Sequence, residues 1–256
     1  MDSILWEMIY DGEKGETGMR KIVILLVGTG LLAIVGFWGY GWVKKDRVSG
    51  DLTIEKDSAK SLDVEIGFGA GNLLIEGGAE GWVDGVINTN VKKWDPTISY
   101  KKKGKVGHVA IRQKTKGLLA FRNARNDWNL QLTNEIPVNL AVEMGVSDSE
   151  LNLKGIRLSH LSIDAGVSDT TINLNDDWQE SFEAEINLGV GDAKIHLPKE
   201  TGVKLIISKG LGSLGTKGFI SQGNGVYVNE AYDHSDTAIN LKIDVGVGDL
   251  KLLLDE

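Results

Sequence analysis

One short pattern recurs along the sequence and constrains the fold more than any other feature. Apolar alternation is followed by a Gly-Val-Gly-Asp or Gly-Val-Ser-Asp turn and then by apolar alternation again. The clearest copies are Ile186–Leu197 and Ile243–Leu254, and Ile163–Leu174 is close to them. The turns begin at Gly145, Gly166, Gly189, Gly210 (a degenerate copy) and Gly246, at intervals of 21, 23, 21 and 36 residues.

The apolar positions around these turns align from copy to copy. Before the turn they fall at odd offsets from its first glycine, and period two resumes after it, as expected of strands with one buried face. We therefore predict that these aligned side chains stack as a core. The prediction covers Leu140, Val142, Leu151 and Leu153 in the first of these copies, their equivalents in the others, and the residue after each first glycine, which is Val146, Val167, Val190, Leu211 or Val247.

A fixed period near twenty residues with aligned apolar positions is typical of a β-solenoid. We predict a mainly β protein in which residues 62–256 form a parallel, β-helix-like solenoid with inserted hairpins. An earlier copy of the phrase spans Leu62–Gly77, and residues 80–135 interrupt the pattern with alternations typical of antiparallel hairpins. The interval of 36 residues leaves room for another hairpin around Gly223–Gly225.

Composition excludes some classes of site. With 33 glycines and only 3 prolines, the chain favours recurrent tight turns over disorder. The absence of cysteine excludes disulfides, thiolate zinc sites and cysteine nucleophiles. His108, His160, His196 and His234 are scattered without metal-ligand spacing. We find no catalytic set, and we expect no metal and no cofactor.

An uncharged segment near the start places the chain at a membrane. Residues 22–43 carry no charge, are long enough as a helix to cross a bilayer, and end in aromatic residues before a basic cluster. We predict a short segment at 1–21, a retained single span at 22–43 and a linker at 44–61. Met19 is an alternative start. The flanking charges nearly tie, and a start at Met19 favours an extracytoplasmic domain.

The repeated acids Asp148, Asp169, Asp192 and Asp249 follow the turn glycines. They could form a calcium ladder or the carboxylates of a carbohydrate-cleaving enzyme. We favour a structural role in the turn, because an aspartate side chain bonds nearby backbone and tolerates left-handed conformations. Asn72 at the equivalent place in the first copy supports the turn role and weakens the charge role.

Basic residues gather in one region although the net charge is −8. Between Lys92 and Arg125, Asp95 is the only acid, and Lys101, Lys102, Lys103 and Lys105 form the densest group. This group could contact anionic lipid headgroups or an anionic wall polymer, or it could simply be a solvated face. The acidic remainder of the domain argues against a nucleic-acid partner.

The sequence resembles the toast-rack domain of bacterial envelope proteins, which is related to the C-terminal domain of LiaF-type proteins. The resemblance is carried by VEIGFGAGNLLIEGGA at Val64–Ala79, by DWNLQL at Asp127–Leu132 and by the GVSD and GVGD turns. It implies a β-helix-like fold, a membrane tether and an association with envelope-stress signalling. LiaF-type proteins usually carry several membrane spans, whereas we predict one here.

These observations favour a non-enzymatic, membrane-anchored interaction or sensing module of a bacterial envelope. Two alternatives stay open at this stage. One is a scaffold that self-associates through exposed solenoid edges, since unpaired strand edges invite pairing. The other is a polysaccharide-active enzyme of the β-helix type, which needs two carboxylates at a defined separation.

Overall fold

The structure is a computed structural model that describes residues 45–46, 50–114 and 124–255. The predicted span at 22–43, the segment 1–21 and Met19 lie outside these residues. Within the described part of the chain, no helix is long and apolar enough to cross a membrane. The described chain, which belongs to one compact unit, is mainly β.

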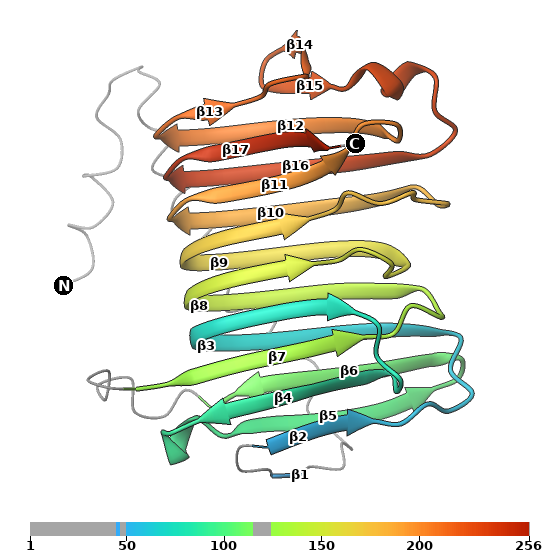
Figure 1. The fold of residues 1–256 in the computed structure, drawn as a ribbon, viewed down its shortest axis with the longest axis vertical. Helices are drawn as coiled ribbons and strands as arrows, with labels where there is room; N and C mark the ends of the chain where they lie inside the picture. The colour runs from blue at the N-terminus through green and yellow to red at the C-terminus, as the bar shows by residue number, and fades with distance from the viewer. Residues whose placement is uncertain (1–44, 47–49, 115–123, 256) are drawn as a thin grey trace, which may run out of the picture. The chain divides into compact units, whose positions relative to one another are not determined.

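The centre of the domain is a stack of coils, each made of two strand segments that meet at a bend (Figure 1). β3 (Ser61–Gly77), β8 (Val138–Asn152) and β9 (Leu158–Asn173) each run through the bend as one long strand. The later coils are divided there into pairs of strands: β10 (Phe182–Val190) with β11 (Ala193–Pro198), β12 (Gly202–Leu211) with β13 (Leu214–Gly215), and β16 (Ala238–Val247) with β17 (Leu250–Asp255).

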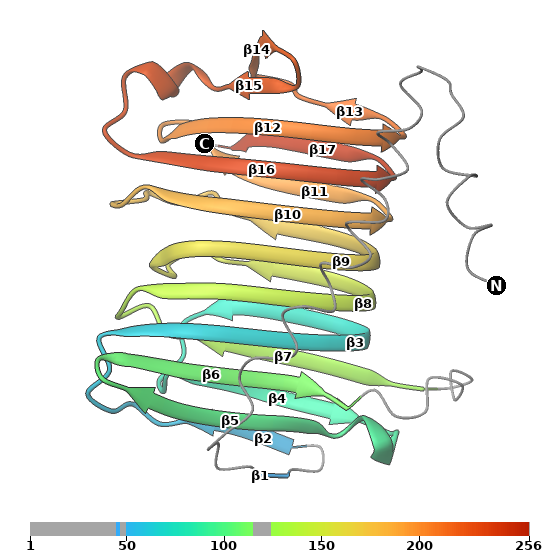
Figure 2. The same cartoon turned by 180° about the vertical axis from the view of Figure 1, so that it is seen from behind.

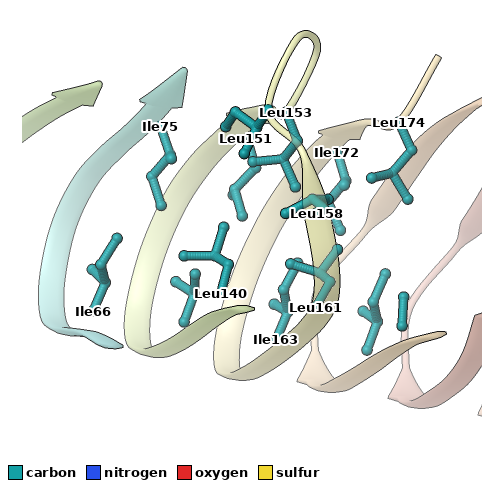
Figure 3. Packing of buried hydrophobic residues seen from close by; sticks show 14 of the residues in the cluster. Ile66, Ile75, Leu140, Leu151, Leu153, Leu158, Leu161, Ile163, Ile172 and Leu174 are labelled. Carbon is teal, nitrogen blue, oxygen red and sulfur yellow. The ribbon is translucent and has the colours of Figure 1, made fainter. Parts of the chain in front are cut away.

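Neighbouring coils pair in parallel and in register. Leu140 lies opposite Val64 on one side and Leu161 on the other, so equivalent side chains stack from coil to coil. The inner residues predicted within the strands on either side of the bend are mostly buried, and Figure 3 shows some of them filling the space between the two walls of the stack. Leu151, Leu153, Ile172 and Leu174 are fully buried on one wall, as Leu140, Leu161 and Ile163 are on the other.

The order of the coils differs from their order in the sequence. β16 pairs with β10 on one side and with β12 on the other, and β17 pairs with β11 and β13 in the same way. The last coil is therefore inserted between the two that precede it (Figure 2). The long connection carries the predicted hairpin, formed by β14 (Ile220–Gly223) and β15 (Val226–Val228), and β15 pairs with β12.

The stretch that we predicted to interrupt the pattern contributes a further coil. β6 (Val106–Gln113) and β7 (Asn126–Leu132) pair in parallel with the two halves of β3. Their inner residues include Ile111 and Trp128, and Trp128 packs edge-on against Phe68 with ring centroids 5.2 Å apart. Antiparallel pairing also occurs here, because β5 (Pro96–Lys103) pairs with β6 and β4 (Val83–Thr89) pairs with β7.

Part of the predicted linker belongs to the packed domain. β2 (Gly50–Ile54) pairs antiparallel with β4, and Leu52 and Ile54 are buried. β1 (Lys45–Asp46) pairs with β5. The domain thus begins before Leu62, and its first strands cover the end of the stack at which β6 and β7 lie.

Candidate interaction surfaces

The four repeated aspartates lie at the bends, on one edge of the stack. The carboxylates of Asp169, Asp192 and Asp249 connect neighbouring coils instead of closing their own turn. Asp169 Oδ1 accepts the backbone N–H of Asp192 at 3.0 Å, and Asp192 Oδ1 accepts that of Asp249 at 2.8 Å. Asp249 Oδ1 then accepts the N–H of Ser213 at 2.7 Å, where the degenerate copy has no aspartate. We call Asp148, Asp169, Asp192 and Asp249 the aspartate column.

The bond from Ser213 has an electrostatic consequence. The backbone N–H of Ser213 is the main reason that the pKa of Asp249 lies below its usual value, and the nearby Lys209 and Lys251 act in the same direction. Because all four aspartates are exposed and lie on successive coils, the column presents negative charge to solvent at the regular spacing of a β-sheet, ~4.8 Å.

The first glycine of each bend is required because the coils approach closely there. A Cβ atom at any of these glycines would overlap the carbonyl oxygen of the equivalent glycine in the neighbouring coil. The distances would be 2.3 Å for Gly145, 2.8 Å for Gly166, 2.5 Å for Gly189, 2.4 Å for Gly246 and 2.2 Å for Gly210. The bends therefore carry a column of bare backbone.

The apolar residue after each of these glycines is exposed, so our prediction that it joins the core was wrong. The side chains alternate inward up to the residue before the glycine, and then two successive residues, Gly145 and Val146 for example, both face solvent. The exposed fractions are 53% for Val146, 50% for Val167, 47% for Val190, 46% for Val247 and 71% for Leu211. We call these five residues the valine ridge.

The ridge begins one coil after the bend of β3. There the equivalent residue is Ala70, which is 7% exposed. Its backbone N–H and that of Gly69 donate to Gln113 Oε1, and its carbonyl oxygen accepts from Asn126 Nδ2 at 2.7 Å. Sequence reasoning missed this polar cover, because neither Gln113 nor Asn126 belongs to a repeated turn.

The lysines that we predicted to contact an anionic surface lie on the hairpin formed by β5 and β6: Lys101, Lys102 and Lys103 end β5, and Lys105 lies in the turn before β6. Lys102, Lys103 and Lys105 are exposed and Lys101 is half-buried. Lys102 Nζ donates to Ser58 Oγ and lies 3.9 Å from Asp57 Oδ2, so the charge of Lys102 is partly neutralised. The hairpin lies on the first coils of the domain, and β5 also pairs with β1, the first described strand.

Asp57 anchors this hairpin to the start of the domain. Burial alone would raise the pKa of Asp57, but hydrogen bonds from the Ala59 N–H and from Trp82 Nε1, together with the nearby Tyr100 and Lys102, lower it below its usual value. Burial, together with the adjacent Asp57 carboxylate, raises the pKa of Tyr100 to about 12. This tyrosine stays neutral at physiological pH and has a structural role.

A shallow depression lies on the outer face where β3, β4, β7 and β8 meet. Asn72, Asn88, Asn129, Asp127, Asp148 and Glu150 surround Leu74 and Val86 there. Asn72 Nδ2 donates to Asp127 Oδ1 at 2.7 Å. Among the described residues, no group of three or more histidine, aspartate or glutamate side chains could hold a metal ion.

Two of the four histidines, His108 and His196, lie beside a carboxylate of a neighbouring strand, whereas His160 and His234 are exposed. His108 Nδ1 lies 3.1 Å from Asp63 Oδ2, and His196 contacts Asp255 on the neighbouring coil. Both pairs join parallel strands, β3 to β6 and β11 to β17.

A comparison with models of protein families identifies the family to which this architecture belongs. Residues 43–196, which are more than half of the chain, match the model described as the N-terminal domain of toast_rack, DUF2154. The chain belongs to the toast-rack family. This confirms the resemblance seen in the glycine turns and in Val64–Ala79.

Solved structures resemble the toast-rack chain to different degrees. The crystal structure of a "putative cell adhesion protein" from Clostridium sporogenes ATCC 15579 shares 28% sequence identity, with a TM-score of 0.77. The match covers 84% of this chain and 100% of that one. A "putative adhesin" from Bacteroides fragilis NCTC 9343 shares 13% identity over 83% of this chain and 98% of its own, with a TM-score of 0.28, too low to support an argument. A search of curated proteins found no match.

Proposed function

We propose that this toast-rack protein is a non-enzymatic interaction module of a bacterial cell envelope, of the kind that mediates adhesion. The observation that carries the proposal is the 28% identity and the TM-score of 0.77 to the "putative cell adhesion protein" of Clostridium sporogenes, across the whole of that chain. The repeated architecture supports it, because a stack of identical bends displays one set of side chains many times along a rigid edge.

In this proposal the domain is tethered by residues 22–43 as a single membrane span and lies on the extracytoplasmic side. The uncharged run and its aromatic end support the span. The resemblance to LiaF-type domains suggests envelope-stress sensing as the setting in which the interaction is used.

The experiment is a protease-accessibility assay on intact bacteria that produce the full chain, combined with chemical crosslinking in the same cells. We expect added protease to cleave the domain without lysis and crosslinking to yield a discrete complex with a partner. A domain that is cleaved only after lysis, or that is recovered solely as an uncrosslinked monomer, would contradict the proposal.

The hairpin of β5 and β6 with its four lysines indicates which end of the domain faces the membrane or wall in this proposal. We infer that Lys101, Lys102, Lys103 and Lys105 contact anionic headgroups or an anionic wall polymer. The support is their place on the hairpin of β5 and β6, whose first strand pairs with β1, at the end of the domain nearest in sequence to the proposed span. Each near-surface cation contributes about 1 kcal/mol against a charged membrane, and the pairing of Lys102 with Asp57 reduces its share.

The hairpin is tested with the full chain in nanodiscs and purified teichoic acid as the anionic probe. Replacing the four lysines by glutamine should weaken binding at least tenfold at low salt. Lys154→Gln with Lys217→Gln removes two exposed cations elsewhere and should change binding little. Equal loss in both variants would show a general charge effect and reject a specific role for the hairpin.

A further inference from the structure

The valine ridge is a continuous apolar column without a role in the core. Parallel register places Val146 opposite Val167, Val167 opposite Val190, Val190 opposite Val247 and Val247 opposite Leu211. At the spacing of neighbouring strands, the five residues extend over ~19 Å. Contiguous exposed apolar residues on a soluble domain mark an interaction site more often than scattered ones do.

The ridge position holds an apolar residue in all five coils, and stacking between neighbouring coils explains this only in part. β-branched side chains on adjacent strands stabilise a sheet through cross-strand contact. About half of each valine nevertheless stays exposed after that contact is made, and Leu211, which has a ridge neighbour on one side only, is 71% exposed. Threonine would satisfy the same backbone preference with a polar surface.

Charge along the flanks indicates what kind of partner fits. In each coil that has one, the aspartate of the column follows the ridge residue by two positions in the sequence. The hydrogen bonds described for the column come from backbone N–H groups of the next coil. On the other flank lie Glu143, Asp164 and Asp244, of which Glu143 and Asp244 pair with Arg112 at 3.6 Å and Lys242 at 3.4 Å. Like charges spaced so closely repel, and a cationic partner would relieve that repulsion.

The same charges argue against two other occupants. A second copy placed ridge to ridge would bring acidic flanks together, and an anionic membrane surface would be repelled by the aspartate column. The remaining fit is a segment that is apolar along one stripe and basic beside it.

We propose that the valine ridge binds an amphipathic, cationic helical segment of a partner protein, with Lys or Arg side chains over the aspartate column. The apolar stripe of an α-helix repeats every ~5.4 Å, close to the ~4.8 Å of the ridge, whereas one face of a strand repeats every ~6.6 Å. A ridge of ~19 Å corresponds to ~13 helical residues. The column of glycines beside the ridge lets the helix approach the backbone. This inference rests on the proposed role as an interaction module and names the chemistry of its partner.

The test measures binding of a synthetic helical peptide to the full chain in phosphatidylcholine nanodiscs, with empty nanodiscs as the reference. The peptide has leucines along one stripe and lysines beside it, and a matched peptide has glutamate in place of every lysine. We expect saturable binding of the lysine peptide, weakened by salt, and at least tenfold weaker binding of the glutamate peptide.

Two pairs of variants separate the apolar and electrostatic contributions. Val167→Thr with Val190→Thr keeps β-branching, and Asp169→Asn with Asp192→Asn keeps the Oδ1 acceptor of the bonds between coils. Each pair should weaken lysine-peptide binding at least tenfold. Val86→Thr, a valine that is 40% exposed on β4 and off the ridge, should leave it unchanged.

Unchanged binding by both variant pairs, or equal binding of the two peptides, would overturn the proposal. So would concentration-dependent self-association of the wild-type chain that the threonine pair abolishes while peptide binding persists, since a second copy would then be the occupant. If the peptide does not bind but crosslinking in cells yields a discrete partner, the valine ridge is rejected as the binding site and the proposed function stands. Peptide binding without any accessible domain or crosslinked partner in cells would instead reject the proposed function.

Discussion

At the scale of the residue, glycine at the bend is a steric requirement. Gly189 does not need a positive φ, but a Cβ there would lie 2.5 Å from the Gly166 carbonyl oxygen and 3.5 Å from that of Ala165. Backbone cannot move away without disturbing the pairing of β9 with β10. Gly189→Ala should therefore destabilise the domain by about 1–3 kcal/mol, measured by denaturant unfolding. Gly215→Ala meets its nearest neighbour at 3.7 Å and should change stability by less than about 0.5 kcal/mol.

The acid at the end of the aspartate column links stability to pH. The Ser213 N–H holds the folded-state pKa of Asp249 below its usual value, so its ionised form is favoured by folding. This contribution is present above the ordinary pKa of an aspartate and is lost as pH falls through the folded-state pKa. Asp249→Asn should lower the thermal midpoint at about pH 7, and the difference from wild type should vanish in acid. A difference that grew on acidification would contradict this linkage. Asp51→Asn, at an exposed position of β2, is the control.

At the scale of the element, the inserted last coil determines which strands depend on one another. β12 has β16 as its parallel partner and is otherwise paired with the short β15. Deleting residues 238–256 should therefore abolish amide protection in β12 and β15, while β3, β8 and β9, which pair among themselves, keep theirs. Hydrogen exchange followed by mass spectrometry measures this. Retained protection in β12 would show that it can pair with β10 instead.

The same elements show what alternation can and cannot predict. Leu140 and Ile163 were correctly placed in the core because period two is unambiguous within a strand. Val146 was misplaced because the bend exposes two successive residues, and an apolar side chain after glycine gives no sign of where the phase resets. Coil order was also beyond reach. The turns at Gly189 and Gly246 are alike, so local pattern does not specify which coil stacks on which.

For the candidate surfaces, too, the sequence predicts some features and not others. The aspartates and lysines were found in the sequence because charge and spacing are visible there. Their partners were not, because Asp169 bonds a backbone N–H 23 residues away and Lys102 reaches Ser58 through the antiparallel arrangement of β5 and β6. The valine ridge required the three-dimensional bend, since nothing in the letters distinguishes Val146 from the buried Val142.

At the scale of the whole molecule, both ends of the stack carry features that oppose end-to-end growth. β5 and β4 pair antiparallel with β6 and β7 at one end, and the β14–β15 hairpin covers part of β12 at the other. In the terminal coil, Lys209 occupies the position of Val245 in its neighbour, and its Nζ atom is buried without a hydrogen-bond partner among the described residues. An inward charge on an edge strand disfavours pairing with another chain.

Lys209 therefore gives a direct test of the self-assembling scaffold. Replacing it by leucine would remove a charge that association would have to bury. It would also continue to the end of the stack the apolar column of Phe68, Met144, Ala165, Leu188 and Val245. We expect Lys209→Leu to raise thermal stability and to sediment as concentration-dependent oligomers, whereas wild type and Lys217→Leu, an exposed lysine on the neighbouring turn, sediment alike. If the wild-type chain self-associates and Lys209→Leu self-associates to the same extent, the end of the stack is open and Lys209 does not prevent pairing there. In that case growth along the stack would extend both the valine ridge and the aspartate column, and the scaffold interpretation would gain the support it lacks while the ends are closed.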